Sequence, residues 1–115
     1  MKVIIVGGGQ VGSYLALLLK ERGHEVTVLE AKAARIETLR KSLPEEAVIL
    51  GNGTDPKTLE SAGIHHTDVV AAVTGLDETN LVIATLAKLE YGVRRVVGRV
   101  EYPYHCRQRP QRGQG

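Results

Sequence analysis

The stretch "VIIVGGGQVGSYLALLLKERGHEVTVLE", from Val3 to Glu30, decides the fold. It opens with branched apolar residues, which are typical of a strand buried on both faces. Three glycines follow, and apolar residues then recur at helical spacing as far as Leu19. A second apolar run ends at Glu30. The stretch therefore predicts a strand, a glycine-rich turn, a helix and a second strand.

The glycines of this turn match the G-x-G-x-x-G pattern, with Gly7, Gly9 and Gly12 at its three positions. The pattern is weak alone, but it becomes specific between a strand and a helix. The first glycine allows a tight turn, the second lets a diphosphate approach the backbone, and the third lets the helix pack on the strand. The N–H groups at the start of the helix would then bind the anion.

Glu30 lies at the end of the second predicted strand, 18 residues after Gly12. A carboxylate at this place can accept hydrogen bonds from both ribose hydroxyls of an adenosine, and it repels a 2′-phosphate. The sequence therefore predicts NAD(H) rather than NADP(H) as the cofactor. The alternative is that the glycines only make a turn and that Glu30 is a solvated strand end.

Strand and helix patterns alternate along the rest of the chain with short connections, which predicts a parallel sheet covered by helices on both faces. We expect an α/β, Rossmann-like fold with the strand order 3-2-1-4-5. The predicted strands are Lys2–Val6, Glu25–Leu29, Ala47–Leu50, Asp68–Thr74 and Arg95–Val100. The clearest later helices are predicted over Ala33–Leu43, Asp55–Ala62 and Glu78–Tyr91.

Two further strand ends should reach the same crevice, because ligands of open parallel sheets bind at the carboxyl ends of the strands. The segment 51–54 has small residues that leave room for an adenine, and Asn52 could hydrogen-bond a base edge. The segment 73–75 should lie next to the glycines. Arg99, near the end of the fifth strand, could reach a phosphate or form a surface ion pair. Ordinary turns are the alternative for both segments.

Charge and composition narrow the classes of function. The chain of 115 residues has 15 Lys and Arg, 13 Asp and Glu, and a formal net charge of +2. Arg107, Arg109 and Arg112 lie in the last nine residues, which contain no acid, so residues 1–106 have 12 bases, 13 acids and a net charge of −1. Binding to nucleic acid is not expected, because it needs a basic face on the folded part.

The single cysteine, Cys106, excludes an internal disulfide and a cysteine-based zinc site, so we expect a reducing, cytoplasmic setting. No metal site is expected from the four histidines. The longest uninterrupted apolar run, Leu15–Leu19, is too short to cross a bilayer, and we expect no signal peptide before the first strand. Direct insertion into a membrane is therefore not predicted.

Four segments together resemble the RCK N-terminal, or TrkA-N, domain, a nucleotide-binding regulatory module of bacterial and archaeal potassium channels and transporters. They are "VIIVGGGQVGSYLA", "LGNGTDPKTLESAGI", "TDVVAAVTGLDETNLVIATLAK" and "RVVGRVEYPYH". The resemblance covers residues 1–105. The "DETN" helix start directly after "AVTG" is more specific than the glycine pattern, because most NAD-dependent dehydrogenases lack it.

The resemblance implies a sensor and not an enzyme. A bound nucleotide would change the shape of a homo-oligomeric cytosolic ring, and the ring would act on a membrane potassium channel or transporter subunit. The chain would lie in the cytoplasm, at the inner face of the cell membrane. Residues 106–115 are predicted to be a disordered polar and basic tail, where family members continue with a helix, a sixth strand and commonly a second ligand domain.

Carried over by position, the resemblance also implies a set of binding residues. Gly7, Gly8, Gly9, Gln10 and Val11 would hold the diphosphate, and Gly12 would pack the helix. Glu30 would bind the adenosine ribose, and Asn52 and Gly53 would flank the adenine. Val73 and Thr74 would lie beside the phosphates and the second nucleoside, and Arg99 would reach the ligand.

Family members that bind ATP and ADP use an arginine inside the glycine loop, where this chain has Gln10. This difference favours NAD(H), with ATP or ADP as the alternative ligand. Two other functions remain open from the residues alone. One is the cofactor-binding fragment of an NAD-dependent dehydrogenase or reductase, although the Tyr-x-x-x-Lys pair of short-chain dehydrogenases is absent. The other is a nucleic-acid-binding redox sensor, against which the charge of the domain argues.

Overall fold

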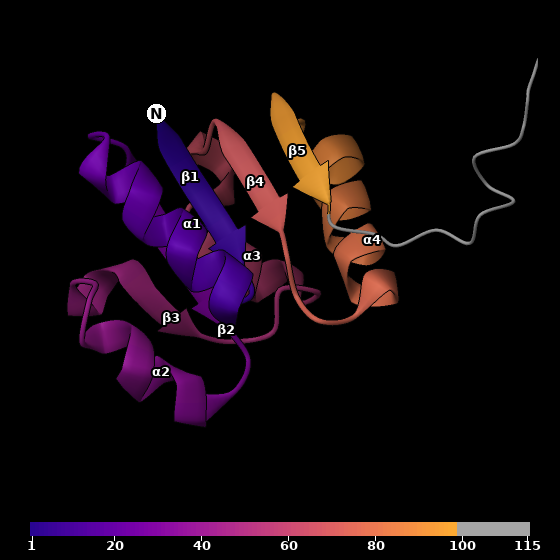
Figure 1. The fold of residues 1–115 in the computed structure, drawn as a ribbon. Helices are drawn as coiled ribbons and strands as arrows, with labels where there is room; N and C mark the ends of the chain where they lie inside the picture. Colours follow the sequence, from indigo (N-terminus) through magenta and orange to yellow (C-terminus); the bar gives the residue numbers. More distant parts are fainter. Residues whose placement is uncertain (99–115) are drawn as a thin grey trace, which may run out of the picture.

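A computed structural model describes residues 1–98 of the chain, which form one five-stranded parallel sheet with the order β3-β2-β1-β4-β5. The strands are β1 (Lys2–Val6), β2 (Glu25–Glu30), β3 (Val48–Leu50), β4 (Val69–Ala72) and β5 (Arg95–Gly98). In Figure 1 the arrows of β1, β4 and β5 point the same way, so their carboxyl ends share one edge of the sheet. The predicted fold class and strand order are confirmed. Arg99 and the predicted tail at 106–115 lie outside the described residues.

Helices connect every pair of consecutive strands. They are α1 (Gln10–Glu21), α2 (Ala33–Arg40), α3 (Pro56–Ser61) and α4 (Asp77–Thr85), with short 3-10 turns η1 (Glu45–Ala47) and η2 (Ile64–His66) and a π-helical turn η3 (Leu86–Glu90). Among residues 1–98, no helix has the length and apolar character needed to span a membrane.

The core has two layers, one on each face of the sheet. Val3 and Ile5 of β1 pack with residues of α1 and α2, while Ile4 and Val6 pack with residues of α3 and α4. This alternation follows from the two-residue period of a strand. Because both faces of β1 are covered, its four residues from Val3 to Val6 are all buried. The apolar run at the start of the chain therefore specifies the central strand.

Two helices differ from the prediction. Helix α2 ends at Arg40 rather than Leu43. Leu43 still lies in the core, where its N–H donates to the carbonyl of Leu39 at 2.9 Å, so the apolar spacing continues in a turn. The other helix was predicted as one piece over Glu78–Tyr91. It changes at Leu86 into η3, and the Tyr91 N–H accordingly donates five residues back, to the Leu86 carbonyl at 3.1 Å.

Candidate functional site

A cleft of about 460 Å³ opens at the carboxyl ends of the strands. It lies between the loop after β1, the end of β2, and the loops after β3 and β4. Its lining consists of Val6, Gly7, Leu29, Glu30, Ala31, Lys32, Arg35, Gly51, Asn52, Gly53, Thr74, Gly75, Leu76, Thr79 and Ile83. Five of the residues predicted from the sequence therefore line one cavity, at the edge of the sheet where ligands of this fold class bind.

The glycine loop, residues 7–12, is closely packed against its neighbours. Gly7 has φ +112°, and a Cβ there would lie 2.9 Å from the Thr74 nitrogen and from the carbonyl carbon and oxygen of Val73. A Cβ on Gly12 would overlap the carbonyl oxygen of Gly7. Any side chain at these two positions would therefore displace backbone, and the loop keeps its shape only with glycine there.

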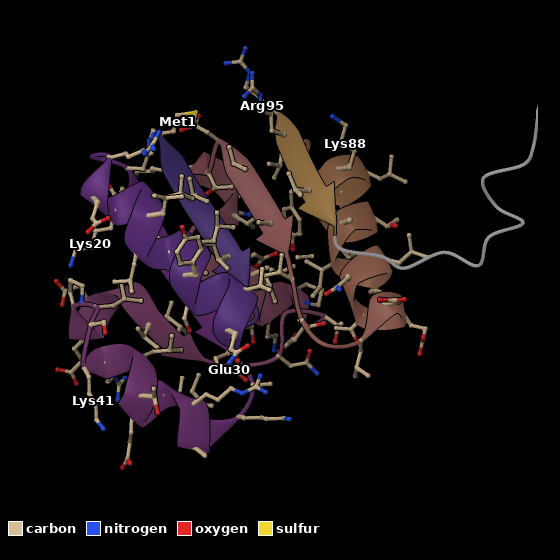
Figure 2. All side chains as sticks on the ribbon, in the orientation of Figure 1. Met1, Lys20, Glu30, Lys41, Lys88 and Arg95 are labelled. Atoms are coloured by element: carbon tan, nitrogen blue, oxygen red, sulfur yellow. The ribbon has the colours of Figure 1, made fainter. Side chains whose placement is uncertain are left out.

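Glu30 lies at the end of β2 with its carboxylate turned to the glycine loop (Figure 2). The residue is buried, with an exposed fraction of 4%. Its Oε1 accepts a hydrogen bond from the Gly8 N–H at 2.6 Å, and its Oε2 accepts one from the Lys32 N–H at 2.8 Å. A carboxylate has about four acceptor sites, so these two bonds leave capacity for two ribose hydroxyls.

Asn80 holds the loop after β4 in place from the first turns of α4. The residue is fully buried. Its Oδ1 accepts from the Thr74 N–H at 2.8 Å and from the Thr74 hydroxyl at 2.6 Å, and its Nδ2 donates to the Thr74 carbonyl at 3.1 Å. The Thr74 backbone lies against Gly7. Asn80 therefore supports the glycine loop indirectly, through Thr74.

The loop after β3 forms the far wall of the cleft. The Gly51 N–H donates to the Glu30 carbonyl at 2.9 Å, which ties this loop to the end of β2. A Cβ on Gly53 would overlap the side chain of Val6, so Gly53 lies against β1. Asn52 is exposed, and its Oδ1 accepts from the N–H and hydroxyl of Thr54 at 2.9 and 2.8 Å. Its Oδ1 thus shapes the turn.

The remaining predicted residues lie around the cleft. Gly8 contacts it through Glu30, and Gly9 caps α1, so the start of this helix faces the loop. Gln10 and Val11 are exposed in the first turn of α1 but are not among the lining residues. Val73 packs under Gly7 through its backbone.

Several residues of the site were not predicted from the sequence. Lys32 and Arg35, at the start of α2, line the cleft, and the Arg35 Nη1 lies 3.6 Å from the Glu30 Oε1. Thr79 and Ile83 of α4 form the opposite side. A signal for Arg35 was present, because the first turn of a helix that follows a strand must lie at the carboxyl edge of the sheet.

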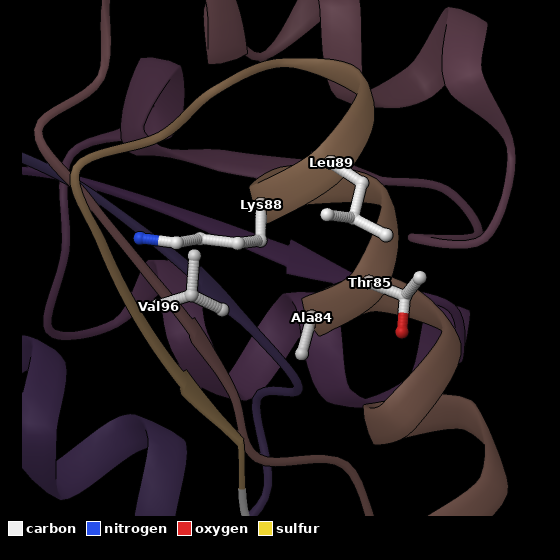
Figure 3. Close-up of a pocket in the computed structure, with 5 residues that line it drawn as sticks. All are labelled: Ala84, Thr85, Lys88, Leu89 and Val96. Atoms are coloured by element: carbon white, nitrogen blue, oxygen red, sulfur yellow. The ribbon is translucent and has the colours of Figure 1, made fainter.

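A second hollow, of about 350 Å³, lies between α4, η3 and β5. Figure 3 shows Ala84, Thr85, Lys88 and Leu89 on its helical side and Val96 on β5. Among these five residues there is no carboxylate and no glycine-rich turn, both of which the cleft around Glu30 has. This hollow therefore has the character of a packing surface rather than of a nucleotide site.

Comparison with known proteins identifies the family. Residues 3–112 match the TrkA-N domain family, and the chain belongs to that family. Proteins named as Trk system potassium uptake proteins resemble this chain along most of its length. The resemblance stated from the sequence is therefore confirmed.

Three relatives illustrate this. A Trk system potassium uptake protein TrkA homolog of Methanothermobacter thermautotrophicus is 45% identical over 105 residues, which are 91% of this chain and 48% of the relative. The protein TrkA of Mycobacterium tuberculosis is 39% identical over 103 residues, 90% of this chain and 46% of the relative. A Trk system potassium uptake protein TrkA homolog of Archaeoglobus fulgidus is 40% identical over 103 residues, which are 90% of this chain and 23% of the relative. The chain thus spans about half or less of the length of these relatives.

Solved structures support the fold. The Kef CTD of Shewanella denitrificans, in an AMP-bound form, matches with a TM-score of 0.71 and 22% identity over 84% of this chain and 57% of that one. A short chain dehydrogenase/reductase family oxidoreductase of Aeromonas hydrophila matches with a TM-score of 0.55 and 23% identity. The match covers 81% of this chain and 53% of that one. At these identities the two structures establish a shared Rossmann-like fold and nothing about ligands.

Proposed function

We propose that this chain is the nucleotide-binding regulatory domain of a potassium uptake system, and that it binds NAD(H) in the cleft around Glu30. The observation that carries the proposal is the Glu30 carboxylate, held by the N–H groups of Gly8 and Lys32 beside the start of α1. An adenosine ribose would donate to this carboxylate, and the diphosphate would lie against the glycine loop. The membership of the TrkA-N family supports the regulatory role.

Replacing Glu30 with alanine is expected to weaken NADH binding about tenfold or more. Hydrogen bonds to a charged group contribute about 1.5–3 kcal/mol each, and about 1.4 kcal/mol corresponds to a tenfold change in affinity. Isothermal calorimetry with NADH, NAD, NADPH, ATP and ADP would measure this and would rank the ligands. We expect NADH and NAD to bind more tightly than NADPH and ATP.

Glu37→Ala is the matched control, because Glu37 is an exposed acid on α2 that does not line the cleft. The affinity of the Glu37→Ala variant for NADH should equal that of the parent chain. If Glu30→Ala bound NADH as tightly as the parent, the ribose role of Glu30 would be wrong. A clear preference of the parent for ATP or ADP would assign the chain to the adenine-nucleotide branch of the family instead.

The mechanism that we propose is a shift between two shapes of an oligomer. A ligand shifts such an equilibrium only by the difference in its affinity for the two states. The cleft is built from four separate loops that meet around one cavity, so closing on a nucleotide would move these loops relative to one another. The oligomer would transmit this change to a membrane potassium channel or transporter subunit from the cytoplasmic side.

Self-association is proposed through the face formed by α4, η3 and β5. Within residues 1–98, β5 is the outermost strand on its side of the sheet, and such an edge is open to further pairing. Large apolar side chains are exposed on these elements, with exposed fractions of 53% for Leu81, 79% for Leu89 and 55% for Val97. Leu89 lines the hollow of Figure 3, which a second copy of the chain would fill.

Replacing Leu89 with aspartate is expected to weaken self-association about tenfold or more. Burying a leucine contributes about 1.5–3 kcal/mol, and a buried unpaired carboxylate opposes association further. Light scattering after size-exclusion chromatography, over a series of concentrations, would measure the change. Tyr14→Asp is the control, since Tyr14 is 70% exposed on α1, on a different part of the surface. An equal effect of both variants would contradict the proposed face.

Catalysis by this chain is not proposed, although its fold is shared with a dehydrogenase. Tyr91, which lies before β5 and therefore at the opposite edge of the sheet from the cleft, donates a hydrogen bond to the Glu60 Oε2 at 2.8 Å. This bond raises the pKa of Tyr91, whereas a tyrosine that transfers a proton near neutral pH needs a lowered one. Turnover of NADH with a panel of carbonyl acceptors, lost in Glu30→Ala, would overturn the non-enzymatic proposal.

A further inference from the structure

Arg35 lies over the glycine loop although it belongs to a different element, the first turn of α2. A Cβ built on Gly9 would lie 3.4 Å from the Arg35 Nη1, 3.7 Å from its Cζ and 4.0 Å from its Nη2. The whole guanidinium group, and not one nitrogen alone, therefore faces Gly9. Gly9 is the N-cap of α1, so a cation lies directly above the start of that helix.

The contact between Arg35 and Glu30 does not explain this position. The Arg35 Nη1 is 3.6 Å from the Glu30 Oε1, which is too long for a hydrogen bond. The two short bonds of the carboxylate, at 2.6 and 2.8 Å, come from backbone N–H groups. Within residues 1–98, the Arg35 guanidinium makes no hydrogen bond to a protein acceptor, and 45% of the side chain is exposed. Its partner in the cleft is the Glu30 carboxylate, at ion-pair distance only, so its hydrogen-bond donors stay open to a ligand.

The charges of the cleft favour an anion at this point. Its ionisable lining residues are one acid, Glu30, and two cations, Lys32 and Arg35. The start of α1 adds the positive end of a helix dipole. A guanidinium binds phosphate through two parallel hydrogen bonds, which an ammonium cannot reproduce. A phosphate near Gly9 would thus meet backbone N–H groups on one side and a planar pair of donors on the other.

We propose that Arg35 is the side chain that binds the phosphate attached to adenosine, and that its guanidinium leaves Glu30 for this phosphate when a nucleotide enters. Glu30 then accepts the ribose hydroxyls without a competing cation. The proposal rests on the proposed nucleotide site and adds the group that recognises the phosphate. It also changes the meaning of Gln10. An arginine missing from the glycine loop is replaced by one from α2, so AMP, ADP and NAD(H) share the same contact, and Gln10 does not discriminate among them.

The test compares the parent chain with Arg35→Ala and Arg35→Lys. The probes are AMP and NADH, titrated by calorimetry at low and at physiological salt, and adenosine, added as a competitor of NADH. We expect Arg35→Ala to weaken the binding of AMP and of NADH about tenfold or more, as the loss of a charge-assisted hydrogen bond predicts. The affinity for adenosine, which has no phosphate, should change less than about twofold. Arg35→Lys should restore the charge but only part of the affinity.

Arg40→Ala is the matched control, because Arg40 is an exposed arginine of the same helix that does not line the cleft. It should leave all three affinities unchanged. The affinity of the parent for AMP should fall more steeply with salt than that of Arg35→Ala, since one charge contact is missing there. A residue that only supported the loop would not change this salt dependence.

Two results would overturn the role of Arg35 alone. In the first, Arg35→Ala binds AMP and NADH as tightly as the parent. In the second, Arg35→Ala loses as much affinity for adenosine as for AMP, which would make Arg35 a structural support of the pocket. A parent chain that binds none of the three probes would overturn the proposed function together with this inference, and it is distinguished by the parent titration itself.

Discussion

Replacing Gly12 with alanine is expected to lower the free energy of unfolding by about 3 kcal/mol or more, the upper part of the range for an overpacked interior. An added Cβ would overlap the carbonyl oxygen of Gly7 and would lie 3.5 Å from the Ile5 Cγ2. The overlapping atom belongs to the backbone, so no change of rotamer relieves it. The first turn of α1 would have to move away from the end of β1.

The sign of this effect distinguishes it from helix propensity. In an ordinary helix, alanine is more favourable than glycine by about 0.5–1 kcal/mol, so propensity alone predicts stabilisation at Gly12. The steric overlap is expected to exceed this gain several-fold. Urea unfolding followed by circular dichroism measures the free energy, and an unchanged m-value would show that the cooperative transition is retained.

Gly75→Ala is the control for this experiment. A Cβ on Gly75 has no atom within 4 Å among the described residues, and its φ is not in the left-handed region. We therefore expect its stability to stay within about 0.5 kcal/mol of the parent, as for most surface substitutions. If Gly12→Ala were as stable as Gly75→Ala, the close approach of α1 to the glycine loop would be wrong, and the proposed phosphate position would be wrong with it.

The backbone of this fold was predictable because its signals are local. The apolar run from Val3 to Val6, the glycine spacing and the acid at Glu30 all depend on neighbours within one strand–helix–strand unit. The end of α2 was less predictable, because Leu43 keeps the apolar spacing after the helix has ended. A core contact is preserved there in a different backbone conformation, which periodicity does not distinguish from helix.

The side chains that complete the site were not predictable in the same way. Arg35 reaches Gly9 across 26 residues of sequence, and no spacing rule connects the two. Asn80 was noted only as part of the "DETN" segment, and its bonds to Thr74 follow from how α4 packs on β4. Each residue contacts a segment other than its own helix, Gly9 for Arg35 and Thr74 for Asn80. Such contacts depend on how the chain folds and not on local sequence spacing. The roles of all the predicted site residues toward a ligand stay predictions.

Replacing Asn80 with alanine is expected to destabilise the chain by about 3 kcal/mol, because buried groups that lose their partner cost about 1–3 kcal/mol each. The Thr74 N–H and carbonyl would both lose the bonds that Asn80 makes, in a part-buried loop. Since Thr74 contacts Gly7, the loop after β1 should loosen too, and NADH binding should weaken with it. Urea unfolding measures the stability, and hydrogen exchange of the Thr74 amide measures the local opening.

Asn52→Ala is the exposed counterpart to Asn80→Ala, because both side-chain oxygens accept two hydrogen bonds from a threonine. The Asn52 Oδ1 also accepts two bonds, from the N–H and hydroxyl of Thr54, at distances close to those that Asn80 makes with Thr74. Asn52 is exposed, so water can replace it, and the expected cost is about 1 kcal/mol or less. An equal loss in both variants would mean that Asn80 contributes only as an ordinary turn residue. A much larger loss for Asn80, with faster exchange at Thr74, would identify it as the support on which the glycine loop depends.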